Sequence, residues 1–596
     1  MYIAAIAAQI LAVVFSLLVP LIVKFTVDGV LAGQKMELPG FIDRLLKEPG
    51  FITVPGMLGI CAAAVVIATL FQCLLSYFKD RWTNIAMENM AKRMKDALYS
   101  HIQNMPYDWH LKASTGDMIQ RCTSDVETVC GFFREQLIEI GRLGFITVFS
   151  LCAMYALNRF MTAQALVFIP VVLIISYVFF KSIGKRFKAV AEKEGELHAV
   201  LQENLSGARV VRAFGRQKHE AWKFGRRNHE LRALVTNVAR LFAWFWTYTD
   251  VICRIEVIAI LFTSIFLAVR GDITLGTMLA FNTYVNMQIW PMRDLGQMLS
   301  GLGRMHVSLG RVYEILDEPV EECLEERETD ETELKGDIVF DGVCFGYEEN
   351  RPILKDLSFM VKNGETIGIL GKTGSGKSTL THILLRLYDY TSGSITINGA
   401  ELRHISKKWL RRRIGIVLQE PFLYSKTILE NLRMSNHDAA ECEIIRAAET
   451  AAIHKTIQGF EQGYETVVGE NGATLSGGQK QRIAMARTLI KNSDILIFDD
   501  SLSAVDTETD ARIRVSLRER RRHVTTFIIS QRISTLMETD LIFILEDGRL
   551  SDFGTHEELI TRDGLYSRIW NIQSMREDAF DEGDPDEELS LRKGVI

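Results

Sequence analysis

Six long apolar segments in about the first three hundred residues constrain the fold of this chain more than any other feature. Each is about 20 residues long or longer, which is the length that an α-helix needs to cross a bilayer. They run from Ile3 to Val30, Gly56 to Phe78, Leu137 to Leu157, Met161 to Phe180, Val251 to Val269 and Met278 to Leu299. The first is too long for the apolar core of a cleavable signal peptide, so we expect six spanning helices in a lipid bilayer.

Two long polar connections follow the second and fourth segments and carry most of the cations of this half. They run for roughly sixty and seventy residues and read as helical. Their cations include Lys79, Arg81, Lys92, Arg93 and Lys95 in the first, and Lys185, Arg186, Lys188, Arg226 and Arg227 in the second. The positive-inside bias makes both connections cytoplasmic. Six crossings return the chain to its starting side, so both termini are expected in the cytoplasm of a multi-pass plasma-membrane protein.

The rest of the chain reads as a soluble α/β domain. The 596 residues, 48% of them hydrophobic, exceed what one soluble core usually organises. We expect a transmembrane domain at 1–318, a solvated acidic linker at 319–335, a soluble domain at 336–576 and an acidic disordered tail at 577–596. The net charge is −6 and the soluble half has no basic stripe with interleaved aromatic residues, so no nucleic-acid partner is expected.

A glycine-rich loop in the soluble half predicts a phosphate site. Its residues are Gly371, Lys372, Thr373, Gly374, Ser375, Gly376, Lys377 and Ser378, between an apolar strand at 366–370 and a helix that continues through Thr379. The glycines let backbone N–H groups face phosphate, and the helix N-terminus adds positive potential. Lys377 is expected to neutralise the β- and γ-phosphates of ATP, and Ser378 to ligate Mg²⁺.

Two further elements belong to nucleotide chemistry. The buried strand pattern at 495–498 ends in Asp499 and Asp500, which places one carboxylate in the Mg²⁺ shell and a second beside the attacking water. The other element opens a second helix with Leu475, Ser476, Gly477, Gly478 and Gln479. Since one nucleotide cannot easily use both helix ends, we expect a head-to-tail pair of domains with ATP between the loop of one and the Ser476 end of the other.

These motifs resemble the nucleotide-binding domain of ABC transporters, whose hallmark is the sequence 475–479. The resemblance implies that Tyr347 stacks on adenine, that Gln419 links Mg²⁺ to the membrane domain and that Asp506 lies in the loop across the dimer seam. Six helices ahead of one such domain resemble the exporter branch. The implied fold is an all-α six-helix transmembrane domain followed by an α/β P-loop ATPase domain. Short coupling helices are implied at 106–117 and 203–215.

Two positions depart from the family's pattern. Asp500 stands where the family usually has glutamate, and Gln531 where it usually has histidine. Asp500 is shorter by one methylene, and a displacement of roughly 1 Å in a water-orienting group can cost about a hundredfold in rate. Gln531 can accept or donate a hydrogen bond but cannot become a cation. Because Lys377, Ser378 and Asp499 remain, we expect the site to hold ATP and hydrolyse it slowly.

This pattern resembles the degenerate subunit of heterodimeric bacterial multidrug exporters. It implies a second half-transporter subunit as partner, whose own site is completed by the unaltered Ser476, Gly478 and Gln479 of this chain. The expected substrates are amphipathic small molecules, drug-like or lipid-like, moved out of the cytoplasm. The family usually has an amphipathic helix before the first span, so the resemblance also implies a start upstream of Met1.

Other functions stay open at this point. Asp500 and Gln531 are also compatible with an active homodimer that exports lipids or peptides, or with a nucleotide-sensing regulatory subunit that gates a partner without transporting. Two interpretations also hold for the charged residues near the inner end of segments five and six. Asp250, Arg254, Glu256, Arg293 and Asp294 either line a substrate cavity or pair with one another at the membrane interface.

Overall fold

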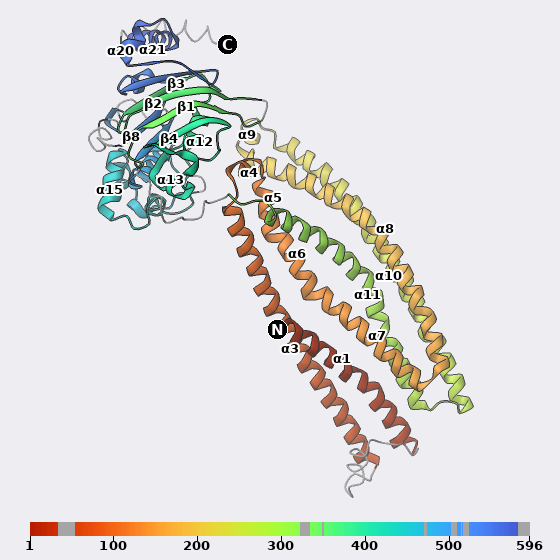
Figure 1. Cartoon of the computed structure of the whole chain (residues 1–596). Coiled ribbons are helices and arrows are strands. Elements are labelled where there is room, and N and C mark those ends of the chain that lie inside the picture. The colour runs from red at the N-terminus through yellow and green to blue at the C-terminus, as the bar shows by residue number, and fades with distance from the viewer. Residues whose placement is uncertain are drawn as a thin grey trace. The chain divides into compact units, whose positions relative to one another are not determined.

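The structure is a computed structural model, and it describes residues 1–33, 54–321, 334–348, 351–469, 472, 474–501, 509, 511–513, 515 and 524–581. The chain divides into two compact units (Figure 1). One comprises Met1–Met105 and Ala113–Val320, and the other comprises Pro106–Lys112 and Glu321–Ile596. The first expected coupling segment, 106–117, is therefore divided between the two units. Its residues 106–112 belong to the second unit, and residues 113–117 belong to the first.

The described part of the first unit is helical. Its elements are α1 (Tyr2–Phe25), the π-helix η1 (Thr26–Leu31), α3 (Val54–Gln103), α5 (Thr115–Gln120), the π-helix η2 (Arg121–Asp125), α6 (Val126–Gly131), the π-helix η3 (Phe132–Gln136), α7 (Leu137–Leu157), α8 (Arg159–Ser206), α9 (Ala208–Ala213), α10 (Gln217–Arg270) and α11 (Leu275–Leu316). Helices α8 and α10 lie side by side and are joined through the short α9 (Figure 1). The polar connections are thus helical, as the sequence predicted.

Five helices of the described chain are long and apolar enough to cross a membrane. They cover Tyr2–Leu31, Val54–Gln103, Thr115–Leu157, Arg159–Ser206 and Gln217–Arg270. Helix α11 contains the sixth expected segment but is not among them, because polar side chains such as Asn282, Gln288 and Arg293 lower its mean hydropathy. That sixth span stays a prediction.

Polar groups join α11 to the beginning of the chain. The hydroxyl of Tyr284, a fully buried side chain, donates a hydrogen bond of 2.8 Å to the carbonyl oxygen of Leu17. At the N-terminus of α11, the carboxylate of Asp28 accepts a hydrogen bond of 2.8 Å from the N–H of Gly276. A side chain at Gly276 would meet that carboxylate at 2.6 Å, so only glycine fits.

The charged residues at positions 250–256 of α10 and at 293 of α11 divide between the two interpretations. Asp250 pairs with Arg293 of α11 at 3.1 Å and with Arg254 at 3.2 Å. The guanidinium of Arg293 also donates to the carbonyl oxygen of Trp246 and lies over its ring, 4.6 Å from the centroid. These residues therefore pair, whereas Glu256 lines a cavity between helices.

The second unit holds two sheets. A four-stranded antiparallel sheet has the order β2-β1-β4-β5, and a six-stranded sheet has the order β10-β9-β3-β8-β7-β6, parallel except for β10, which runs antiparallel to β9. The strands are β1 (Ile338–Phe345), β2 (Leu354–Val361), β3 (Thr366–Gly371), β4 (Ser392–Ile397), β5 (Ala400–Glu401), β6 (Ile414–Val417), β7 (Ile495–Asp499), β8 (Thr525–Ile529), β9 (Leu541–Glu546) and β10 (Arg549–Gly554). The carboxyl ends of β3, β8 and β7 consequently lie next to one another.

Helices cover these sheets. They are α4 (Tyr107–Lys112), α12 (Lys377–Leu384), the 3₁₀ turn η4 (Leu402–His404), α13 (Lys407–Arg413), α14 (Ile428–Arg433), α15 (Glu441–Thr450), α16 (His454–Gln458), the 3₁₀ turn η5 (Gly463–Glu465), α17 (Gly477–Ile490), α19 (Ile533–Leu536), α20 (His556–Thr561) and α21 (Leu565–Asp581). The strands β3, β7 and β8 are almost wholly buried apolar residues, as expected for a parallel sheet with both faces covered.

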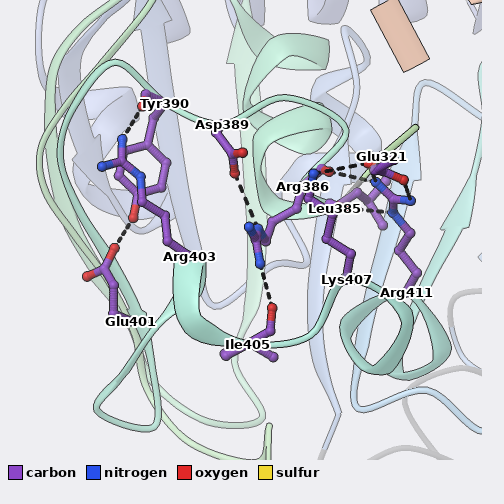
Figure 2. Close-up of polar contacts among 10 residues, drawn as sticks. All are labelled: Glu321, Leu385, Arg386, Asp389, Tyr390, Glu401, Arg403, Ile405, Lys407 and Arg411. Carbon is purple, nitrogen blue, oxygen red and sulfur yellow. Dashed lines mark hydrogen bonds and ion pairs between the residues drawn. The ribbon is translucent and has the colours of Figure 1, made fainter. Parts of the chain in front are cut away.

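The structure describes only part of the two acidic segments that were expected as a solvated linker and a disordered tail. The carboxylate of Glu321 is not solvated: it accepts hydrogen bonds from Arg411 at 2.7 and 2.8 Å and from Lys407 at 3.1 Å (Figure 2). Helix α21 ends at Asp581 and so includes residues 577–581 of the expected tail. Helix α13 thus holds Glu321 of the expected linker, and helix α21 extends into the expected tail. Residues 322–333 and 582–596 lie outside the described chain.

Candidate nucleotide site

The candidate site lies where three neighbouring parallel strands end. Strand β8 pairs with β3 through Ile529 and Ile369, and with β7 through Ile529 and Asp499. This register brings the loop after β3 and the residues after β7 and β8 to one edge of the sheet. The cleft there is lined by Ile353, Thr373, Gly374, Gly376, Lys377, Ser378, Thr379, Gln419, Asp499, Asp500, Ile529, Ser530 and Gln531.

The loop after β3 has the shape that a phosphate group needs. Gly374 and Gly376 have φ values of 83° and 99°, which side chains rarely adopt, and α12 begins directly afterwards. The ammonium of Lys377 donates to the carbonyl oxygens of Gly371 and Lys372, both at 2.8 Å. Burial lowers the pKa of Lys377, and Asp499 and Asp500 oppose this shift. An anion in the loop would give this cation a partner in place of the two carbonyl oxygens.

Ser375 and Gly371 support the loop from beneath and do not line the cleft. The side chain of Ser375 is 4% exposed, and its hydroxyl has no hydrogen-bond partner in the described chain. A Cβ at Gly371 would lie 2.5 Å from that hydroxyl oxygen and from the carbonyl oxygen of Leu545. An orphaned buried hydroxyl beside a nest of glycines is consistent with a site built for a phosphate-bearing ligand such as ATP.

The two acidic residues after β7 differ in environment. Asp499 is buried, which raises its pKa, while the hydroxyl of Ser378 donates a hydrogen bond to it and opposes the shift. Burial and the neighbouring Asp499 also raise the pKa of Asp500, and Lys377 opposes this. Carboxylate and hydroxyl oxygens at one point form a donor set that fits Mg²⁺.

Gln531 and Gln419 enter the same cleft from two different loops. The loop after β8 is held by α21, because the side chain of Gln573 donates to the carbonyl oxygen of Gln531 and accepts from the N–H of Ile533, both at 2.9 Å. Gln573 therefore fixes the backbone of Gln531, whose side chain is exposed and lines the cleft. The structure thus brings both departures from the family's pattern, Asp500 and Gln531, to one site.

Tyr347 lies at the end of an aromatic cluster next to α12. Its hydroxyl is 3.3 Å from that of Thr379 and 3.4 Å from Nδ1 of His382, whose pKa is lowered by burial. Its ring meets the ring of Tyr388 edge to face at 5.0 Å. On the other side of this cluster, Tyr107 of α4 packs edge to face on Tyr388 at 5.8 Å. The 45% exposed ring of Tyr347 leaves apolar surface for a planar base.

Ser476 caps the second helix end. Its side chain accepts a hydrogen bond from the N–H of Gln479 at 3.3 Å, and the Gln479 side chain accepts one from the N–H of Ser476 at 2.9 Å. Among the residues that the structure describes, those that line the cleft of the same chain do not include Ser476, Gly477, Gly478 or Gln479. Asp506 lies outside those residues. The chain therefore holds two separate anion-receptive helix ends.

Sequence reasoning missed two kinds of contact. Ile353, from the residues before β2, lines the cleft although no local motif marks it. Ser530 also lines it, and its position inside the strand-end sequence 528–532 was a usable signal. The contact of Tyr107 with His382 and Tyr388 joins residues more than 270 positions apart and has no signature in the sequence.

A membrane-embedded helical domain followed by a P-loop α/β domain defines an ATP-driven membrane transporter subunit, and comparisons with known proteins agree. Residues 2–292 match the family model described as ABC transporter transmembrane region, and residues 354–503 match the one described as ABC transporter. The chain belongs to the ABC transporter family, as an ATP-hydrolysing half-transporter of the exporter type.

Similar proteins cover nearly the whole chain. A Bacillus subtilis protein named "Uncharacterized ABC transporter ATP-binding protein YknU" is 32% identical over 95% of this chain and 94% of its own length. Another from the same organism, "Probable multidrug resistance ABC transporter ATP-binding/permease protein YheI", is 34% identical over 89% and 90%. Among solved structures, a bacterial Atm1-family ABC exporter with ATP bound superposes with a TM-score of 0.80 and 25% identity, covering 96% of this chain and 97% of that one. The expected exporter fold is confirmed.

Proposed function

We propose that this chain is one subunit of a heterodimeric exporter that moves amphipathic drug-like or lipid-like molecules out of the cytoplasm. Both termini face the cytoplasm in this proposal, and ATP binds with Mg²⁺. Resistance to multiple drugs is what the name of the relative YheI says of that protein. The apolar spans and the cations of the two long connections support the orientation.

One observation carries the proposal of a slow site. Asp500 and Gln531 line the same cleft as Lys377, Ser378 and Asp499, so the groups that hold nucleotide and the groups that act on the γ-phosphate meet in one place. The residues that hold the nucleotide match the family's pattern. The two residues that act on the γ-phosphate, Asp500 and Gln531, do not. Loss of a well-placed polar group at the reacting centre lowers the chemical step by about 10²–10³-fold in typical enzymes. The cleft should therefore retain ATP far longer than an ordinary site.

The separate Ser476 helix end supports assembly with a second subunit. Because this end does not line the chain's own cleft, it is free to complete a cleft on a second subunit. Its capping box is intact, which keeps the helix N-terminus in the form that receives a phosphate. A partner with glutamate and histidine at the two altered places would supply the faster site.

The remaining site residues have assigned roles in this proposal. Tyr347 stacks on adenine, Gln419 and Ser378 join Asp499 around Mg²⁺, and Asp506 lies at the seam between the two subunits. The glycine loop receives the phosphates through Gly371, Thr373, Gly374, Ser375, Gly376 and Thr379. These assignments follow the family's motif at matching positions. A shared cleft supports those of Gln419, Ser378, Asp499, Thr373, Gly374, Gly376 and Thr379, which all line it.

Two variants of this chain, each assembled with the half-transporter that co-purifies with it, test the division of labour. Ser476→Arg places a bulky cation at the end that serves the partner's site, so it should abolish nearly all steady-state ATP turnover. Asp500→Asn affects only the slow site, so turnover should stay within about twofold. Export of a fluorescent dye by reconstituted vesicles should follow the same order. The opposite ranking would contradict the proposal, and ATP turnover without any export would favour a regulatory subunit.

A further inference from the structure

Glu256 is a buried carboxyl without a counter-charge in the membrane domain. It lies on α10 and is 7% exposed. No hydrogen bond or ion pair reaches its side chain from the residues that the structure describes. Asp250, six residues earlier on the same helix, has two arginine partners at 3.1 and 3.2 Å. The two carboxyl groups therefore differ. Arginine side chains neutralise Asp250 within the fold, whereas no cation among the described residues pairs with Glu256.

The side chain of Glu256 lines a cavity between α8, α10 and α11. The cavity is small: it offers about 10 Å³ to the centre of a water-sized group, which is room for about one such group. Apolar walls come from Phe168 and Val172 of α8 and from Ile289 and Met292 of α11. Gln288 also lines it, and its amide nitrogen donates to the hydroxyl of Ser150. The cavity is therefore a narrow apolar space with one acidic end.

The depth of Glu256 places it inside the bilayer. The expected span on α10 begins at Val251, and a rise of 1.5 Å per residue puts Glu256 about 7 to 8 Å beyond the inner edge. An ionisable group at that depth is rare and usually marks a substrate or ion path. A buried carboxylate without a partner is costly, and a positively charged ligand removes that cost.

We propose that Glu256 binds the ammonium group of a transported amine, whose apolar body packs against α8 and α11. The proposal rests on the proposed exporter function and adds that cationic amphiphiles are bound in preference to uncharged ones. A primary ammonium group has about the size of a water molecule and fits the space beside the carboxyl. A trimethylammonium group is too large for it, and an uncharged amide brings no charge.

Three probes that share a dodecyl tail and differ in the head group distinguish the ammonium, amide and trimethylammonium cases: dodecylamine, N-dodecylacetamide and dodecyltrimethylammonium. Equilibrium binding of each radiolabelled probe is measured on the assembled exporter in lipid nanodiscs, with empty nanodiscs subtracted. Wild type should bind dodecylamine more tightly than the other two. Glu256→Gln should weaken dodecylamine by about tenfold or more and leave the acetamide within about twofold. Glu256→Asp, which keeps the charge, should retain part of the preference.

Asp250→Asn is the matched control, because it removes the same charge from the same helix at a carboxylate that already has partners. It should leave the ratio of amine to acetamide affinity within about twofold of wild type. Equal losses for all three probes in Glu256→Gln would mean that Glu256 only supports the helices, and an unchanged ratio would equally overturn the proposal. Export of the acetamide by wild-type vesicles tests the exporter function separately, since that probe does not need Glu256.

Discussion

The main-chain N–H of Asp500 donates a hydrogen bond to the carbonyl oxygen of Ile529, with a nitrogen–oxygen distance of 2.9 Å. Ile529 ends β8 two positions before Gln531, so this bond joins the backbones that carry the two altered side chains. Asp500 has a φ of 43°, a left-handed conformation in which aspartate is more common than longer side chains. The two altered residues are therefore carried by backbone segments that are hydrogen-bonded to each other. The length of the Asp500 side chain and the chemistry of the Gln531 side chain distinguish this site from an ordinary site of the family.

Restoring both side chains should accelerate the slow site more than either change alone. Asp500→Glu and Gln531→His act on the same chemical step, so their effects should be coupled rather than additive. We expect the double variant to raise hydrolysis at this site by about a hundredfold and each single variant by less than about threefold, so that the product of the two single effects stays below about tenfold. Single-turnover hydrolysis checks this in an assembly whose other site is blocked by Ser476→Arg. Multiplicative effects of the two single variants would contradict the coupling.

Nucleotide binding should depend on Lys377 and not on Asp500. Lys377→Ala removes the cation that the loop presents to phosphate, so affinity for a fluorescent ATP analogue should fall by about tenfold or more. Asp500→Asn should change the affinity by less than about threefold. Equilibrium titration of both variants against wild type measures the difference. A large loss of affinity in Asp500→Asn would show that the cleft does not separate holding from hydrolysis.

The Tyr347 ring, rather than its hydroxyl, should hold the base. Its hydrogen-bond distances to Thr379 and His382 are long, at 3.3 and 3.4 Å, whereas its ring is supported by Tyr388. Tyr347→Ala should therefore weaken ATP binding by about tenfold, and Tyr347→Phe by no more than about twofold, as measured by calorimetry. Equal losses in the two variants would assign the contribution to the hydroxyl instead.

Glu321 should stabilise α13 in a pH-dependent way. Burial raises its pKa, but hydrogen bonds and charge from Arg411 and Lys407 outweigh this and leave the pKa lowered. A lowered folded-state pKa gives stability that is complete above the unfolded value near 4.3 and is lost as pH falls through the folded value. Glu321→Gln should thus speed hydrogen exchange of α13 amides at pH 7, corresponding to about 1–2 kcal/mol.

The difference between Glu321→Gln and wild type should begin to shrink below about pH 4, where the unfolded-state carboxyl takes up a proton, and should vanish once pH falls below the lowered folded-state pKa of Glu321. Lys426→Gln serves as a control, because its side chain takes no part in the Glu321 contacts. A difference that is constant from pH 7 down to pH 3 would show that charge does not matter at Glu321.

Sequence reasoning predicted the parts of the fold and site that local patterns encode. The apolar segments, the loop from Gly371 to Ser378 and the strand before Asp499 each carry their own signature. The pairing of Asp250 with Arg293 and the position of Ile353 depend on helices and strands that pack from distant parts of the chain, and no local rule specifies them. Glu321 shows the same limit, because its acidic neighbours indicated a solvated linker whereas two cations of α13 hold it.

The central claim is that this chain binds ATP well and hydrolyses it poorly without a different partner. The most direct measurement is steady-state ATP turnover of the purified chain alone, reconstituted in lipid, together with ATP binding by the same sample. We expect saturable ATP binding with turnover about a hundredfold below that of the assembly with its partner. Brisk turnover together with dye export by the chain alone would contradict the account.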